Sequence, residues 1–225
     1  MTLSPAESYA LSKIRSKFPK TKKFAESFPF ELDHFQIEAC HALESGKGVL
    51  VAAPTGAGKT IVGEFAVDLV INSGGKCFYT TPIKALSNQK FQELSSKYGE
   101  SKIGLLTGDT SINSEAQIVI MTTEVLRNMI YSNSSTIADL KYVVMDEVHY
   151  LADKFRGAVW EEILIHLSEA VQVISLSATV SNAEEFGEWL QTVRGDTEVI
   201  VSEIRPVPLY QHVLFGNRLL DLFGD

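Results

Sequence analysis

Short apolar runs alternate with longer amphipathic runs along most of this chain. Runs rich in valine, isoleucine and leucine, bounded by small or polar residues, are typical of strands that are buried on both faces. The pattern predicts strands at residues 49–53, 77–81, 103–107, 118–121, 142–146, 171–177 and, near the C-terminus, 209–214. Between them it predicts helices, notably over residues 59–71, 158–167 and 183–193. This alternation indicates an α/β fold in which a parallel β-sheet is sandwiched between helices.

Composition narrows the class of protein further. The chain has 225 residues, of which 45% are hydrophobic and 21% charged, which suits one globular domain with a core of its own. No apolar stretch is long enough to span a membrane, and the N-terminus lacks a secretory signal. Cys40 and Cys77 lack any paired spacing and are expected to be reduced core residues. We therefore expect a cytoplasmic protein, or a nuclear one in a eukaryote, without membrane contact.

The charge is uneven along the chain. The net charge is −8, which is unfavourable for binding nucleic acid through a basic surface. Residues 1–30 nevertheless carry six basic and two acidic side chains, so the acidity lies in the remainder. We expect residues 1–27 to be a flexible basic leader and the domain to begin at residue 28. The basic run at 13–23 could contact RNA, but a solvated leader is the favoured interpretation.

The loop after the first predicted strand has the pattern of a phosphate-binding loop. Residues 53–60 read APTGAGKT, between an apolar strand and an apolar helix. Small residues let backbone N–H groups approach phosphate oxygens, and the positive end of the following helix points at the same place. Lys59 would supply a mobile cation and Thr60 a hydroxyl ligand for Mg²⁺. Ala53 stands where the usual pattern has glycine. The alternative, a glycine-rich turn without a ligand, is much less favoured.

A pair of carboxylates follows a later strand. Residues 146–149 read DEVH, directly after the apolar run 142–145. At a strand end Asp146 is placed to hold Mg²⁺, directly or through water, and Glu147 to orient or deprotonate an attacking water. Such a pair also occurs by chance, but its position after a phosphate loop strengthens the functional interpretation. The ligands predicted from these motifs are ATP and Mg²⁺.

These motifs, in this order, resemble those of superfamily 2 DExH-box nucleic-acid helicases. The third element of the order is SAT at residues 177–179. Further segments resemble the superkiller-type, exosome-associated RNA helicases and their bacterial relatives, namely FPFELDHFQ at 28–36, TPIKALSNQ at 81–89, TGD at 107–109, MTTEVLR at 121–127, RGAVWEE at 156–162 and RPVPL at 205–209. The resemblance implies that residues 28–205 form the first RecA-like, ATP-binding domain of such an enzyme.

The resemblance also implies roles for single residues. The ATP contacts would be Gln36, Thr55, Gly56, Ala57, Gly58, Lys59 and Thr60, the Mg²⁺ ligands Thr60 and Asp146, and the catalytic residues Glu147, Asp146 and Lys59. His149, Ser177 and Thr179 would couple the ATP site to a second domain. Pro82, Lys84, Ser87, Gly108, Thr122 and Thr123 would line a single-stranded RNA track.

Simpler structural roles compete with some of these assignments. Gln36 would read the adenine edge through its amide, but Asp33 and Gln36 also have the spacing of a helix capping box. His149 could be a hydrogen-bonded structural histidine. Either Thr122 or Thr123 could cap a helix, which is compatible with phosphate binding at the same helix terminus.

Helicases of this superfamily use two RecA-like domains with ATP between them, and the second supplies arginines to the transferring phosphate. Nothing after residue 179 resembles the later motifs, so we expect residues 206–225 to begin a linker to a second RecA-like domain. An arginine supplied by another domain can be worth ~10³ to 10⁵ in rate, so this chain alone should be nearly inactive as an ATPase. An RNA-degrading complex is a further expected partner.

Three alternatives remain beside the RNA helicase. One is the equivalent domain of a DNA repair helicase, against which the segment at 156–162 argues. Another is a non-enzymatic nucleotide-binding scaffold, which is disfavoured because Lys59, Thr60, Asp146 and Glu147 are all present. The last is a P-loop kinase, which would leave the segments at 81–89 and 177–179 without an explanation.

Overall fold

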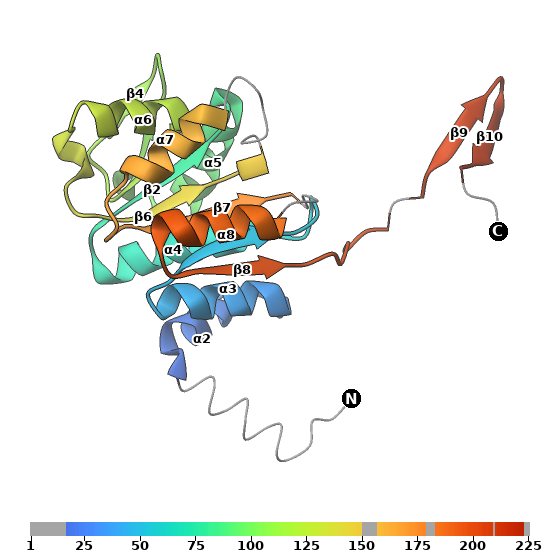
Figure 1. Ribbon diagram of the computed structural model, residues 1–225, viewed down its shortest axis with the longest axis horizontal. Helices are drawn as coiled ribbons and strands as arrows, with labels where there is room; N and C mark the ends of the chain where they lie inside the picture. Colours follow the sequence, from blue (N-terminus) through green and yellow to red (C-terminus); the bar gives the residue numbers. More distant parts are fainter. Residues whose placement is uncertain (1–16, 150–156, 179–182, 209, 223–225) are drawn as a thin grey trace.

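An eight-stranded β-sheet runs through the protein (Figure 1). The computed structural model describes residues 17–149, 157–178, 183–208 and 210–222. Within the sheet the strands follow the order β4-β3-β5-β2-β6-β7-β1-β8, and all neighbours are parallel except β3 and β4. Their bounds are β1 Gly48–Ala52, β2 Lys76–Thr81, β3 Ile103–Leu106, β4 Ser111–Ile112, β5 Ile118–Thr122, β6 Leu140–Met145, β7 Gln172–Ser177 and β8 Thr197–Val201.

Helices cover both faces of the sheet and create two separate hydrophobic cores (Figure 1). One core takes side chains from α2 Pro19–Ala25, α3 His34–Glu44, α4 Thr60–Ser73 and α5 Lys84–Tyr98. The other takes them from α6 Thr123–Tyr131, α7 Gly157–His166 and α8 Ala183–Arg194. Two short 3₁₀ turns, Glu100–Lys102 and Ser135–Ile137, precede β3 and β6.

Successive strand residues enter opposite cores, because side chains of a strand alternate between its faces. On β2, Cys77 and Tyr79 face the core under α4 and α5, whereas Phe78 faces the core under α6 and α7. All three side chains are fully buried. Burial on both faces explains why these strands read as continuous apolar runs in the sequence.

The six predicted central strands and three predicted helices are all present, and their ends differ from the prediction by one or two residues. The sandwiched parallel sheet is therefore confirmed. The pattern missed β8, an edge strand in which only Thr197 and Ile200 are buried. It also missed the two-residue β4, which is exposed and carries no apolar pattern. Cys40 and Cys77 are free and buried, as expected, and burial raises the pKa of both thiols.

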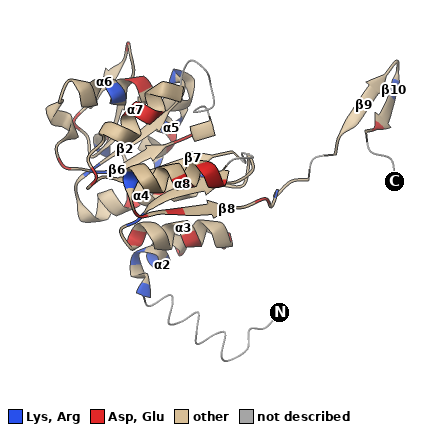
Figure 2. Ribbon diagram, in the orientation of Figure 1, with Lys and Arg blue, Asp and Glu red and all other residues tan. Residues whose placement is uncertain are grey.

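The prediction of a flexible leader over residues 1–27 is wrong for its described helical part. Helix α2 packs on α3 and α4, and Phe24 is 3% exposed in the core. The hydroxyl of Thr21 donates to Glu44 at 2.8 Å and its N–H donates to the same carboxylate at 2.7 Å. The basic residues of this segment, coloured blue in Figure 2, masked the aromatic residue that anchors it in the core. Residues 1–16 lie outside the described part of the chain.

A hairpin extends away from the sheet near the C-terminus (Figure 1). It consists of β9 His212–Phe215 and β10 Arg218–Asp221, which pair antiparallel. The predicted strand at 209–214 therefore begins later than expected, and residue 209 lies outside the described residues. Among the helices that the structure describes, none has both the length and the apolar character needed to cross a membrane.

Candidate functional site

The candidate site lies at the carboxyl ends of the parallel strands, where ligands of open α/β sheets bind. The loop 53–59 leaves β1 here and leads directly into α4. Its first residue is tied to the sheet, because the N–H of Ala53 donates to the carbonyl of Ser177 at the end of β7, at 3.1 Å. The pair Asp146–Glu147 follows the end of β6, and β6 and β1 both neighbour β7. The fold thus brings the two predicted motifs to one edge of the sheet.

The loop has the backbone shape that glycine permits. Gly56 and Gly58 both have positive φ, 87° and 80°, which strains any residue with a side chain. A Cβ at Gly58 would also lie 2.7 Å from Nε2 of Gln36. Thr55 and Gly56 are exposed at the outer side of the loop, whereas Ala57 is buried beneath it. Thr60, the first residue of α4, is partly exposed at the positive end of that helix.

The side chain of Lys59 points into the loop 53–59, to which the residue itself belongs. Its Nζ donates to the carbonyls of Ala53 at 2.8 Å and Pro54 at 3.0 Å, and the residue is 9% exposed. Burial lowers the pKa of Lys59, while the nearby charges of Glu147 and Asp146 raise it. The charges of both carboxylates therefore act on the lysine of the loop.

Asp146 is held in a defined orientation. Its Oδ2 accepts a hydrogen bond from the Tyr79 hydroxyl at 2.9 Å, and its Oδ1 accepts one from the N–H of Glu147, also at 2.9 Å. Burial raises the pKa of the Asp146 carboxyl, and the charge of Glu147 acts in the same direction; the Tyr79 hydrogen bond and the charge of Lys90 oppose them.

Glu147 and His149 lie close together at the same turn. Glu147 has a φ of 59°, an uncommon backbone conformation for a residue with a side chain, and Nδ1 of His149 lies 3.1 Å from its Oε2. Ser177, another predicted coupling residue, is 2% exposed at the end of β7. Thr179 lies outside the described residues, as does Arg156 of the segment at 156–162.

Gln36 lies against the loop 53–59. Its Nε2 contacts the carbonyls of Ala57 at 3.3 Å and Gly58 at 3.1 Å. Its Oε1 accepts from the N–H of Asp33 at 2.8 Å, so the capping box that the sequence allowed is present at the start of α3. Both ends of the amide are engaged within the chain, and the assignment of Gln36 to the adenine edge remains a prediction.

The six residues predicted to line an RNA track divide into two groups. Lys84 and Gly108 are exposed, Thr122 is half-buried at the N-cap position of α6, and Nζ of Lys84 forms a 2.6 Å ion pair with Asp109. The other three, Pro82, Ser87 and Thr123, are buried.

Two of the buried three are occupied by contacts inside the protein. The Ser87 hydroxyl lies 2.7 Å from the Thr81 hydroxyl, and the Thr123 hydroxyl donates to the Thr81 carbonyl at 3.2 Å. These contacts hold the starts of α5 and α6 together. They contradict a direct side-chain contact of Ser87 or Thr123 with RNA, because neither hydroxyl reaches the surface.

Sequence reasoning missed two residues beside Asp146, namely Tyr79 and Lys90. Tyr79 lies in an apolar strand and belongs to no recognisable motif. A buried tyrosine normally needs a partner for its hydroxyl, and that requirement was the available signal. Lys90 lies on the polar helix α5, which lacks a strong apolar pattern.

The donor set fits Mg²⁺ bound together with nucleotide phosphates. Mg²⁺ prefers oxygen ligands and is commonly held by one or two carboxylates plus phosphates and water, and this edge offers the Asp146 carboxylate and the Thr60 hydroxyl. Among the described residues no group of three or more histidine, cysteine or acidic side chains could hold a metal ion by itself.

Comparison with known proteins identifies relatives across most of the chain. The family model described as DEAD/DEAH box helicase matches residues 33–186. A probable helicase HelY of Mycobacterium leprae is 65% identical over 201 residues, which are 89% of this chain and 22% of that protein. The chloroplastic DExH-box ATP-dependent RNA helicase DExH15 of Arabidopsis thaliana is 47% identical over 204 residues, covering 88% of this chain and 17% of that protein.

The antiviral helicase SKI2 of Saccharomyces cerevisiae is 50% identical over 202 residues, covering 89% of this chain and 16% of that protein. Among solved structures, the DUF1998 helicase MrfA bound to DNA and AMPPNP has a TM-score of 0.66 at 24% identity, covering 80% of this chain and 28% of that one. The structural likeness supports the fold alone. The chain spans about a fifth of the length of these curated relatives.

Proposed function

This chain belongs to the DEAD/DEAH box helicase family, and we propose that it acts as the first motor domain of an ATP-dependent RNA helicase of the superkiller type. In this proposal the domain binds ATP with Mg²⁺ at the carboxyl edge of its sheet and single-stranded RNA beside it. Hydrolysis and unwinding would require a second RecA-like domain.

One observation carries the nucleotide assignment: the loop 53–59 after β1 and the pair Asp146–Glu147 after β6 lie at the same edge of the sheet, on the two strands that neighbour β7. A phosphate chain bound by the loop would therefore have its outer end beside both carboxylates. The two carbonyls that now accept from Lys59 would lose that partner as its ammonium turns toward phosphate oxygens. The exchange is favourable because a charge-assisted hydrogen bond to phosphate is stronger than one to a neutral carbonyl.

The catalytic roles follow from what each group can do at this edge. Mg²⁺ would neutralise phosphate charge, with Thr60 and Asp146 as its protein ligands. Glu147 would orient the attacking water and take its proton. His149 lies against Glu147 and, with Ser177 and Thr179, would connect this group to a second domain. Gln36 would report on the bound base through its amide while contacting the loop.

The RNA assignment rests on relatives and on accessible groups. A relative at 47% identity is named as an RNA helicase, and the segment at 156–162 resembles the RNA branch. Lys84, Gly108 and Thr122 are the accessible members of the predicted track. Since the net charge is −8, we expect binding through helix N-termini, backbone N–H groups and Lys84, and we expect it to be weak for this chain alone. The further partners would be a second RecA-like domain and an RNA-degrading complex, in the cytoplasm or the nucleus.

Equilibrium titration with fluorescent ATP and Mg²⁺ tests this proposal. Lys59→Ala should weaken binding roughly 10-fold to 100-fold, as expected for loss of a charged hydrogen bond. Lys102→Ala is the matched control, because Lys102 is exposed directly before β3, at the opposite end of the strands. Competition between single-stranded RNA and DNA of one sequence then separates the RNA from the DNA assignment. Equal ATP affinity of Lys59→Ala and parent would contradict the site, and preference for DNA would contradict the RNA assignment.

A further inference from the structure

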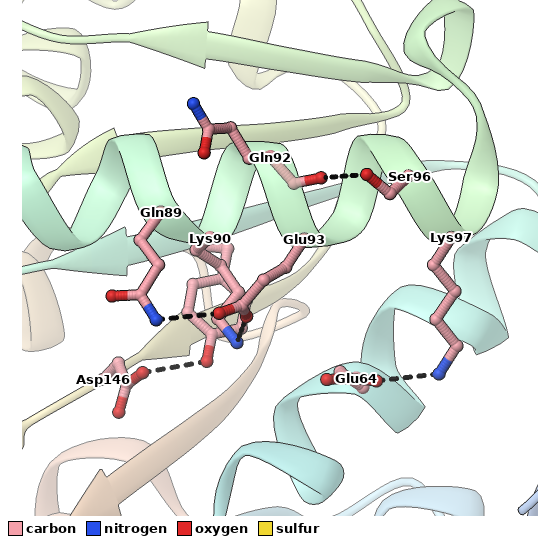
Figure 3. A network of polar contacts seen from close by, with 9 residues as sticks. Glu64, Gln89, Lys90, Gln92, Glu93, Ser96, Lys97 and Asp146 are labelled. Carbon is pink, nitrogen blue, oxygen red and sulfur yellow. Dashed lines mark hydrogen bonds and ion pairs between the residues drawn. The ribbon is translucent and has the colours of Figure 1, made fainter.

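A tyrosine hydroxyl reaches Asp146 from inside the core. Tyr79 is fully buried on β2, and its hydroxyl donates to Oδ2 of Asp146 at 2.9 Å, the contact drawn in Figure 3. The N–H of Glu147 donates to the other carboxylate oxygen, Oδ1, at 2.9 Å. Each carboxylate oxygen accepts two hydrogen bonds or ligands, so both keep a free position for a metal ion or its water. The two donors fix the plane of the carboxylate without blocking it.

The tyrosine ring is itself held by two helices. Gly63 of α4 leaves room for it, since a Cβ at that position would lie 3.0 Å from Cε2 of Tyr79. Nζ of Lys90, on α5, lies over the ring at 5.7 Å from its centroid. Lys90 is 9% exposed and forms a 2.6 Å ion pair with Glu93, as Figure 3 shows. The ring therefore has little freedom to turn away from Asp146.

We propose that Tyr79, held in place by Lys90, is a positioning residue that orients the Asp146 carboxylate for Mg²⁺. The inference rests on the proposed function, because it assumes that Asp146 is a ligand of the nucleotide-bound metal. Groups that hydrogen-bond to a metal-binding carboxylate fix its direction, and their loss typically costs 10-fold to 100-fold in metal affinity. A hydroxyl placed only to satisfy its own burial would leave metal affinity unchanged when removed.

The arrangement also connects two functional regions of the chain. Lys90 lies on the same helix as Lys84, the exposed basic residue of the predicted RNA track. Tyr79 thus lies between a helix that would face RNA and the carboxylate that would face the metal.

The decisive measurement is the Mg²⁺ dependence of nucleotide binding by the 225-residue chain. The affinity for fluorescent ADP is measured in EDTA and then at a series of Mg²⁺ concentrations. The Mg²⁺ midpoint is the Mg²⁺ concentration at which half of the gain in ADP affinity is reached. Tyr79→Phe removes only the hydroxyl and should raise that concentration about 10-fold to 100-fold while the affinity in EDTA stays at the parent value. An unchanged Mg²⁺ midpoint would overturn the proposal.

Tyr98→Phe is the matched control on the same face of the sheet. The Tyr98 hydroxyl is buried with no hydrogen-bond partner among the described residues, and Nζ of Lys97 lies over its ring at 5.4 Å. This variant removes the same atom from a half-buried tyrosine of the same core whose hydroxyl makes no described hydrogen bond, and it should match the parent. If it shifts the Mg²⁺ midpoint as much as Tyr79→Phe does, the effect is one of packing and the positioning role is wrong.

Two further variants keep the result interpretable. Asp146→Asn should abolish the Mg²⁺-dependent gain. If it does not, the proposed metal site itself fails, whereas a loss in Asp146→Asn with a parental Tyr79→Phe refutes the positioning role alone. If Tyr79→Phe does not fold, as judged by circular dichroism, the same measurement is made on Lys90→Met. It leaves the hydroxyl in place but removes the cation over the ring, and it should raise the Mg²⁺ midpoint in the same direction. A parental midpoint would contradict the proposal.

Discussion

Phe24→Ala should destabilise the protein strongly, although this residue lies in a segment whose sequence suggests a flexible leader. Phe24 is 3% exposed, and its ring centroid lies 5.1 Å from those of both Phe28 and Phe65. Nζ of Lys97 lies 5.8 Å from the same ring. The Phe24 side chain therefore belongs to the hydrophobic core between the sheet and helices α3 and α4.

The magnitude follows from the buried area. A buried aromatic side chain removes about 150 to 250 Å² from water, and at about 25 cal/mol per Å² this is worth roughly 4 to 6 kcal/mol. Alanine keeps part of that area, and measured Phe→Ala substitutions in cores cost about 3 to 5 kcal/mol. Helix α2 has only seven residues and could detach before the rest unfolds, which limits the loss. We therefore expect a decrease of about 3 kcal/mol in the free energy of unfolding.

Urea unfolding followed by circular dichroism measures this change as a shift of the midpoint at constant slope. Phe30→Ala is the control, because Phe30 is 54% exposed in the same aromatic cluster and should cost less than about 1 kcal/mol. If Phe24→Ala costs no more than Phe30→Ala, the packing of α2 against the core is wrong.

Three further predictions concern chemistry and binding. In a form of the protein that carries a second RecA-like domain, Glu147→Gln should keep ATP binding and lower the hydrolysis rate about 100-fold to 10,000-fold, as expected for loss of a general base; hydrolysis at the parent rate would remove that role from Glu147. Because burial holds the pKa of Asp146 above the ordinary 3.8, its carboxylate should take up a proton at a higher pH than an exposed aspartate does. Mg²⁺-dependent ADP binding should therefore weaken as the pH falls through that raised pKa, with ADP binding in EDTA at each pH as the control; a loss that follows only the ordinary aspartate range would contradict this. Labelled single-stranded RNA should bind this chain weakly, with strong salt dependence and little base preference; tight binding that barely changes with salt would indicate base stacking instead.

The central sheet could be predicted from the sequence because burial on both faces leaves an unmistakable apolar pattern. The placement of the loop 53–59 and of the Asp146–Glu147 pair at one edge of the sheet could be predicted because the proposed chemistry requires particular residue types at the ends of particular strands. Strand β8 was not predicted, because it lies at the edge of the sheet and only some of its residues are buried. Helix α2 was not predicted, because six basic residues nearby in the sequence outweighed the aromatic side chain that packs in the core.

Within the site, contacts between distant segments could not be predicted from the sequence. Ser87 and Thr123 resemble nucleic-acid contacts in sequence, yet both hydroxyls turn inward to Thr81. The contact of Tyr79 with Asp146 joins residues 67 positions apart, and its existence depends on the register of β2 against β6. The capping box of Asp33 with Gln36 was predictable from spacing alone, whereas the second contact of Gln36, with the loop, was not.

A crystal structure of this chain with ADP and Mg²⁺ tests the central claim most directly. The account predicts the phosphates at the N-terminus of α4, within hydrogen-bond distance of backbone N–H groups of the loop 53–59, with Thr60 and Asp146 facing the metal ion. It also predicts that Lys59 leaves the carbonyls of Ala53 and Pro54, with which its Nζ forms hydrogen bonds of 2.8 Å and 3.0 Å, and turns to the phosphates. Nucleotide bound elsewhere, with the loop empty and Lys59 still on those carbonyls, would contradict the account.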